Sequence, residues 1–204
     1  MDSNWEDKFE NFEVLSEWEK STSTNNNKKL NYFHLVEINS KVYYEVQTQK
    51  PEIMFLLDLK HYKLLEDHTW YSWTTKKRNT YYILTGTNKT IKKVHRMIHL
   101  KWPIIDHINR NGLDNRECNL RKTTPRENNL NRWKRKDNTS GYNGISFDKN
   151  MNAWVFDWKE NNKHKTKCFC ISRRRTSEEA KKLAVEFKLA HNKITDNRNG
   201  YDVN

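Results

Sequence analysis

The chain has 204 residues, of which 34% are hydrophobic and 31% charged, and its formal net charge at pH 7 is +12. This length suits one domain or two small ones with a buried core. Glycine (5) and proline (3) are scarce, which excludes collagen-like and Pro/Gly-rich chains. No apolar run is long enough to span a membrane, and the acidic start MDSNWEDKFE lacks the apolar stretch of a secretory signal. Three cysteines without a CxxC motif predict free thiols in a reducing, intracellular compartment.

The positive charge is unevenly distributed along the chain. Residues 1–20 contain seven acidic residues and two lysines, a net charge of −5. Residues 91–136 contain 13 Lys/Arg against 4 Asp/Glu, a net charge of +9. A basic body favours a polyanionic partner, because each phosphate contact releases condensed counterions. A basic protein with no nucleic-acid role remains the alternative interpretation of charge alone.

The N-terminal half is expected to be β-rich after a separate leading segment. Residues 1–28 are expected to be an acidic segment and linker, and the spacing of aromatic residues in 1–20 predicts an amphipathic helix. The region 29–90 is rich in β-branched and aromatic residues. It predicts a hairpin in 31–47, a strand at 53–57 followed by a helix, and a second hairpin across 70–86.

Residues 91–136 change pattern several times over a short distance. Apolar spacing in 89–102 predicts a helix, and Asp106-His107-Ile108 reads as a short strand followed by the turn signal at Asn111-Gly112. Thr124 and Glu127 match a capping box, with proline at the first helical position. We therefore expect a helix over 125–135.

The last region, 137–195, predicts a small module and leaves 196–204 as a tail. Three segments with period-two alternation lie near residues 145, 154–158 and 166–171. A second capping box, Thr176 with Glu179, opens an expected helix. We predict that Trp154, Phe156 and Trp158 face this helix. Together the regions predict an α+β fold with a β-rich N-terminal part, a central strand-and-helix motif, and a C-terminal three-stranded antiparallel sheet packed on one helix.

Asp106 and His107 supply the parts of a hydrolytic site. A hard divalent cation prefers oxygen ligands, which Asp106 and the amide of Asn128 or Asn129 would provide. The imidazole of His107 titrates in the range needed to take a proton from water. Neighbouring phosphates would be clamped by nearby arginines, which are Arg116, Arg121, Arg126 and Arg132. This combination predicts metal-assisted phosphodiester hydrolysis.

The segment IIDHINRNGLDNRECNLRKTTPRENNLN resembles the HNH endonuclease family, in the branch found in mobile-element, phage and giant-virus nucleases. His107 precedes Asn119 by twelve positions and Asn119 precedes Asn128 by nine, which fits the family spacing. The resemblance implies a ββα-metal fold over 91–136, with Mg²⁺ or Mn²⁺ held by Asp106 and Asn128. It makes His107 the general base and Asn119 the residue that braces the loop and orients His107.

The segment 137–195 is similar to the plant ethylene-response-factor type of DNA-binding domain. The matching positions are Tyr142, Gly144-Ile145, Trp154, Phe169 and the helix start Glu178-Glu179-Ala180. The similarity implies a sheet that binds double-stranded DNA. Phosphate contacts would come from Lys159, Lys165 and Lys167. The family's strand-one arginines are here Ser146 and Asp148, and Ile171 to Arg175 looks inserted before the helix.

The sequence thus predicts a metal-dependent DNA endonuclease of homing or mobile-element type, with a monomer favoured and, for a viral protein, the host cytoplasm or nucleus as its compartment. Two alternatives stay open. One is a sequence-specific transcription regulator with a vestigial nuclease motif. The other is a nonspecific nucleic-acid-binding structural protein.

Overall fold

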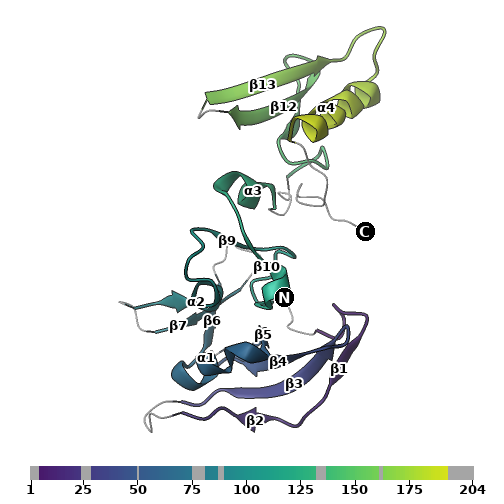
Figure 1. Ribbon diagram of the computed structural model, residues 1–204. Helices are drawn as coiled ribbons and strands as arrows, with labels where there is room; N and C mark the ends of the chain where they lie inside the picture. The colour runs from purple at the N-terminus through teal and green to yellow at the C-terminus, as the bar shows by residue number, and fades with distance from the viewer. Residues whose placement is uncertain are drawn as a thin grey trace. The chain divides into compact units, whose positions relative to one another are not determined.

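The computed structural model describes residues 5–23, 29–49, 51–74, 81–86, 90–131, 137–160 and 163–192. The chain divides into two compact units, Met1–Thr123 and Thr124–Asn204 (Figure 1). Both contain helices and sheets of antiparallel strands, so the predicted α+β class is confirmed. The division falls inside the expected 91–136 region, between its strands and its helix.

The main sheet of the first unit is built around one hairpin. Strands β3 (Tyr32–Ile38) and β4 (Lys41–Gln47) pair antiparallel, which confirms the hairpin predicted in 31–47. Both turn residues between them, Asn39 and Ser40, have positive φ angles, as a tight hairpin turn requires. Strand β5 (Met54–Asp58) adds to β4. On the other side, β3 pairs with the short strands β1 (Phe12–Val14) and β2 (Glu19–Lys20).

The acidic start of the chain belongs to this sheet, and the predicted helix in 1–20 is wrong. Trp5 is only 1% exposed and stacks on Phe9, so the segment is anchored in the core. Strand pairing of β1 and β2 with β3 then satisfies its backbone groups. Long-range pairing here overrides a local helical spacing.

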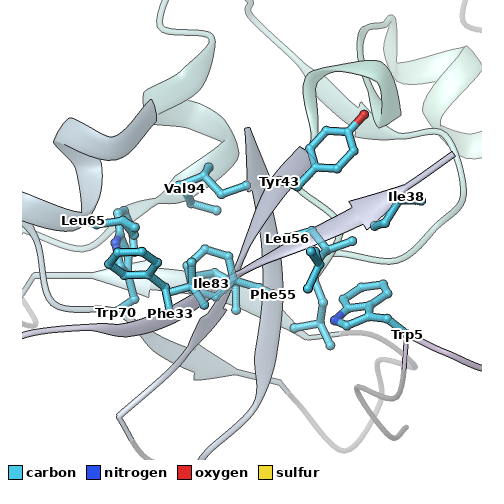
Figure 2. Packing of buried hydrophobic residues seen from close by; sticks show 14 residues of the cluster. Trp5, Phe33, Ile38, Tyr43, Phe55, Leu56, Leu65, Trp70, Ile83 and Val94 are labelled. Carbon is cyan, nitrogen blue, oxygen red and sulfur yellow. The ribbon is translucent and has the colours of Figure 1, made fainter. Parts of the chain in front are cut away.

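The core of the first unit gathers side chains from every part of it (Figure 2). The central residues of β5 are fully buried, and Trp70 packs edge-on against Phe55. After β5 come η1 (Leu59–His61) and α1 (Tyr62–Asp67). A second antiparallel sheet holds β6 (Tyr71–Trp73), β7 (Tyr82–Thr85) and β8 (Lys92–Lys93), followed by α2 (Val94–Ile98). The hairpin predicted across 70–86 is confirmed, whereas the helix expected in 89–102 is only one turn and a half.

A short hairpin ends the first unit. Strand β9 (Ile105–His107) pairs antiparallel with β10 (Leu120–Lys122), and η2 (Glu117–Asn119) directly precedes β10. The loop between the strands is clamped onto β5, because Leu56 donates its N–H to Leu113 and accepts from the N–H of Asn115. Asp58 at the end of β5 accepts a further bond from the Glu117 N–H, at 2.7 Å. The main sheet therefore serves as the support of this loop.

The second unit begins with α3 (Pro125–Leu130). Both hydrogen bonds of the capping box between Thr124 and Glu127 are present, with Pro125 at the first turn, so the predicted helix start is confirmed. The helix ends at Leu130 with Asn131 as its C-cap, before the expected end at 135; the rest of the predicted range, 132–135 with Arg132, lies outside the described residues.

Strands β11 (Ile145–Asp148), β12 (Ala153–Glu160) and β13 (Lys163–Cys170) form an antiparallel sheet in that order. Helix α4 (Ser177–Asn192) contacts β12 and β13. Phe156 and Trp158 pack against Phe187 of α4, and Lys181 lies over the ring of Trp154. The predicted orientation of these three β12 aromatics is thus confirmed.

Candidate active site in the β9–β10 hairpin

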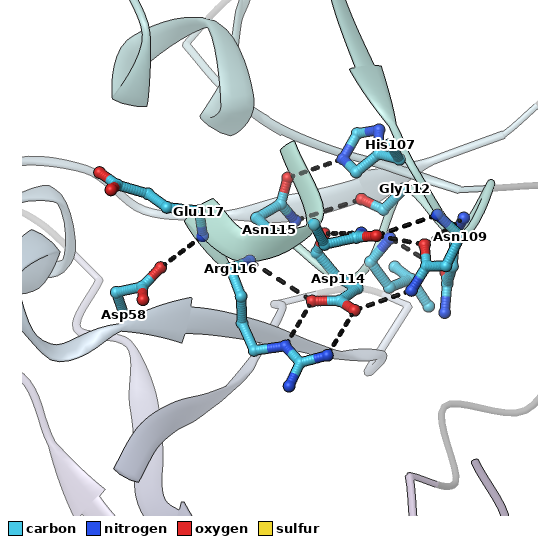
Figure 3. Close-up of polar contacts among 11 residues, drawn as sticks. Asp58, His107, Asn109, Gly112, Asp114, Asn115, Arg116 and Glu117 are labelled. Atoms are coloured by element: carbon cyan, nitrogen blue, oxygen red, sulfur yellow. Dashed lines mark hydrogen bonds and ion pairs between the residues drawn. The ribbon is translucent and has the colours of Figure 1, made fainter. Parts of the chain in front are cut away.

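The loop between β9 and β10 buries an unusual number of polar side chains. Asp114 and Asn115 are fully buried, and Arg116 and Asn119 are 8% and 6% exposed. Buried polar groups are costly unless each finds a hydrogen-bond partner. The partners found here fix the shape of the loop (Figure 3).

His107 is held by the side chain of Asn115. The distance from His107 Nε2 to Asn115 Oδ1 is 3.2 Å, and Asn115 Nδ2 donates to the Gly112 carbonyl at 3.2 Å, which fixes the orientation of the amide (Figure 3). An amide oxygen only accepts, so the His107 proton lies on Nε2. The basic nitrogen of the neutral ring is therefore Nδ1.

The buried surroundings keep His107 in its neutral form. Burial lowers the pKa of His107, while the hydrogen bond to Asn115 and the charges of Asp114 and Asp106 act in the opposite direction. A neutral imidazole at neutral pH is the form that accepts a proton. The chemistry expected of a general base is therefore available at this position.

Asp106 lies next to His107 on β9 and is paired with Arg121. The Arg121 Nη2 and Nε atoms lie 2.6 and 3.0 Å from the same Asp106 oxygen, Oδ2. The two residues are direct partners in the β9–β10 register. Arg121 thus lies at the predicted site. Its guanidinium, however, is paired with the Asp106 carboxylate, whereas the sequence predicted that it binds a phosphate.

Asn119 braces the loop, as the sequence predicts, but a different residue orients His107. Asn119 Oδ1 accepts from the Asn109 N–H at 3.0 Å, and its Nδ2 donates to Asn109 Oδ1 and the Asp114 carbonyl. The direct contact to His107 comes from Asn115. The expectation that Asn119 orients His107 is corrected in this respect.

Arg116 is a structural residue, contrary to its expected role as a phosphate clamp. Its guanidinium makes two hydrogen bonds of 2.8 and 2.9 Å to Asp114 and lies over the rings of Phe9 and Tyr43. Both partners of the ion pair are buried, so the charge is compensated inside the fold. Figure 3 shows Asp114 between Arg116 and Asn109.

A second histidine packs against His107. The ring of His95 on α2 meets His107 edge-on, with centroids 5.0 Å apart, and Tyr82 lies beside both. The pKa of His95 is lowered to about 2, mainly by burial and next by the neighbouring His107. Its Nδ1 is buried without a hydrogen-bond partner among the described residues.

The second unit holds the remaining predicted residues. Asn128 and Arg126 lie on α3, so the pairing of Asn128 with Asp106 stays a prediction. Among the described residues, no group of three His, Cys, Asp or Glu side chains is arranged around one point.

The three predicted DNA-contacting lysines do not share one face of the C-terminal sheet. Lys165 and Lys167 pair with Trp158 and Phe156, so they project on the side of α4. Lys165 makes an ion pair with Glu160, and Lys167 lies over the Phe187 ring. Lys159 projects on the opposite side. The contact of these lysines with DNA phosphates stays a prediction.

Comparison of the chain with protein-family models, with curated proteins and with solved structures found no match. Over the part of the chain that the structure describes, no helix is long and apolar enough to cross a membrane.

Proposed function

We propose that the chain is a metal-dependent DNA endonuclease of the HNH type, with a C-terminal DNA-binding module. The observation that supports it most directly is the orientation of His107, whose Nε2–H donates to Asn115 and whose Nδ1 is therefore the basic nitrogen. A buried histidine held in one tautomer by an amide acceptor is a typical arrangement for a general base. The net charge of +12 suits a polyanionic substrate.

Asp106, next to His107 on β9, offers an oxygen donor of the kind that Mg²⁺ or Mn²⁺ prefers. Mg²⁺ is usually held by one or two carboxylates together with water and substrate phosphate, so it does not need a cage of several acidic residues. Asp106 would supply the carboxylate and Asn128 an amide oxygen. When bound, the ion would stabilise the negative charge that develops on the scissile phosphate. Arg121 fixes the position of the Asp106 carboxylate, since both its hydrogen bonds end on Oδ2.

In the proposed reaction, His107 Nδ1 takes a proton from the attacking water. The water oxygen forms a bond to phosphorus and the P–O3′ bond breaks. The leaving O3′ takes a proton from a solvent water, which gives a 5′-phosphate and a 3′-hydroxyl, and His107 then returns its proton to solvent. Asn115 keeps the Nε2 proton of His107 in place during this step, so that Nδ1 remains the accepting nitrogen.

Incubation of supercoiled plasmid with the chain and Mg²⁺, Mn²⁺ or EDTA tests the proposal. We expect nicked or linear DNA with either metal and intact plasmid in EDTA. Tight, discriminating binding without cleavage in any metal would instead identify a transcription regulator. Binding without discrimination and without cleavage would indicate a structural nucleic-acid-binding protein. The variant Asp106→Asn is the matched control, because it keeps the size of the side chain and removes its charge.

A further inference from the structure

The face of the C-terminal sheet that points away from α4 is poorly suited to a polyanion. From the strand pairing, its polar residues are Ser146, Asp148, Asp157, Lys159, His164 and Thr166. This face therefore carries two carboxylates and one lysine. Asp157 also accepts a hydrogen bond from Thr166 at 2.6 Å and lies 3.9 Å from His164. Phosphate groups approaching this face would meet net negative charge.

A concentrated positive charge lies instead in the segment that joins β13 to α4 (Figure 1). Residues 173–175 are three consecutive arginines. Arg173 and Arg174 are exposed and Arg175 is half-buried. Within the described residues, none of the three guanidinium groups makes a hydrogen bond or ion pair to a side chain. Arg175 acts on its surroundings through charge, because it contributes to the lowered pKa of Glu179 after the hydrogen bonds from Thr176.

The backbone that carries these arginines is well fixed. Ser172 and Arg175 exchange two backbone hydrogen bonds of 3.0 and 3.1 Å, and the Arg174 N–H is directed at the Ser172 hydroxyl. On one side, the Ile171 N–H bonds to the Asn152 carbonyl at the β11–β12 turn. On the other, Thr176 and Glu179 form the capping box of α4. A closed turn presents its side chains at a lower entropic cost than a flexible loop.

We propose that the Arg173–Arg175 turn is the main phosphate-binding element among the described residues of the second unit and binds the backbone of duplex DNA. The inference rests on the proposed nuclease function, which supplies duplex DNA as the partner. Guanidinium groups bind phosphate in a bidentate manner and are weakly hydrated compared with ammonium groups. The lysines of β13 are poorer candidates, since Lys165 is paired with Glu160 and Lys167 lies over an aromatic ring.

The test is the salt dependence of binding of the full chain to a labelled DNA duplex, measured by fluorescence anisotropy in EDTA. The variant R173A/R174A/R175A is compared with K163A/K165A/K167A, which removes the same formal charge from the same unit. The slope of log K against log salt changes by about 0.9 for each phosphate contact. We expect the magnitude of this slope to fall by about 2 to 3 in the arginine variant and by less than about 1 in the lysine variant.

Two further measurements keep the result interpretable. R173K/R174K/R175K should keep most of the slope but bind more weakly, because lysine retains the charge without the bidentate geometry. Thermal melting should show an unchanged midpoint for the arginine variants, since the bonds that close the turn do not involve their side chains. Equal losses in the alanine variants, or an unchanged slope in R173A/R174A/R175A, would overturn the inference. The inference would also be overturned if R173A/R174A/R175A lost binding to duplex RNA or to anionic phospholipid vesicles but still bound duplex DNA normally.

The failure of this inference is separable from failure of the nuclease proposal. A wild-type chain that cuts plasmid with Mg²⁺ while R173A/R174A/R175A binds the duplex normally would refute the inference alone. A wild-type chain that neither binds nor cuts duplex DNA would refute both.

Discussion

The hydrogen bond between His107 and Asn115 offers the sharpest single perturbation of the candidate site. In Asn115→Leu the side chain keeps a similar size but loses its acceptor, so the buried His107 Nε2–H is left without this partner. The imidazole then gains by moving its proton to Nδ1, the nitrogen that must accept a proton from water. We expect slower cleavage with DNA binding unchanged.

The magnitude follows from the cost of leaving one buried donor unpaired, about 1–3 kcal/mol. If this cost appears fully in the barrier, the cleavage rate falls by about 5- to 150-fold. The hydrogen bond that His107 donates to Asn115 also raises the pKa of His107, so its loss should move the acidic limb of the pH–rate profile to lower pH.

The assay is single-turnover cleavage of supercoiled plasmid in Mg²⁺, followed across the acidic limb. Asn115→Asp is the matched variant, because it keeps an acceptor facing Nε2 and adds a negative charge. It should retain more activity than Asn115→Leu and move the acidic limb to higher pH. An Asn115→Leu variant that cleaves at the wild-type rate with an unmoved limb would refute the assigned tautomer.

Two further predictions concern the structural role of groups around the site. Arg116→Ala should lower the free energy of unfolding by about 3–5 kcal/mol, because it leaves the fully buried Asp114 without its ion-pair partner. Chemical denaturation measures this loss. A variant with unchanged stability but a lower salt slope of DNA binding would instead support the role of Arg116 as a phosphate ligand. The pKa of His95 is about 2 in the folded state, compared with 6.5 for a free histidine. As the pH falls below 6.5, the unfolded state therefore takes up a proton at His95 that the folded state does not, and the free energy of unfolding decreases. Between pH 7.5 and 4.5 this residue should cost about 3 kcal/mol of unfolding free energy. His95→Gln should lose correspondingly less over the same interval, and parallel pH dependences for the two proteins would contradict the burial of a neutral His95.

Local signals were enough to predict several elements of this fold. The capping boxes at Thr124 and Thr176 act within four residues, and the helices α3 and α4 begin where those boxes place them. Alternation along β12 likewise predicted which aromatic residues face α4, because strand geometry alone determines it.

Elements that depend on distant partners were not predictable in this way. The aromatic spacing around Trp5 and Phe9 suits a helix, but pairing with β3 and burial of Trp5 make the segment part of a sheet. Arg116 looks like a phosphate ligand until the fold supplies Asp114 on one side and two aromatic rings on the other. Asn115 carries no periodic signal, and its role depends on the clamp between its loop and β5.

The most direct test of the account is the cleavage rate of His107→Ala in Mg²⁺, measured beside the wild-type chain at equal DNA occupancy. General-base catalysis typically contributes about 10²–10⁴-fold, so we expect a loss of that order with unchanged DNA affinity. Plasmid cleavage by His107→Ala at the wild-type rate would contradict the assignment of His107 as the base.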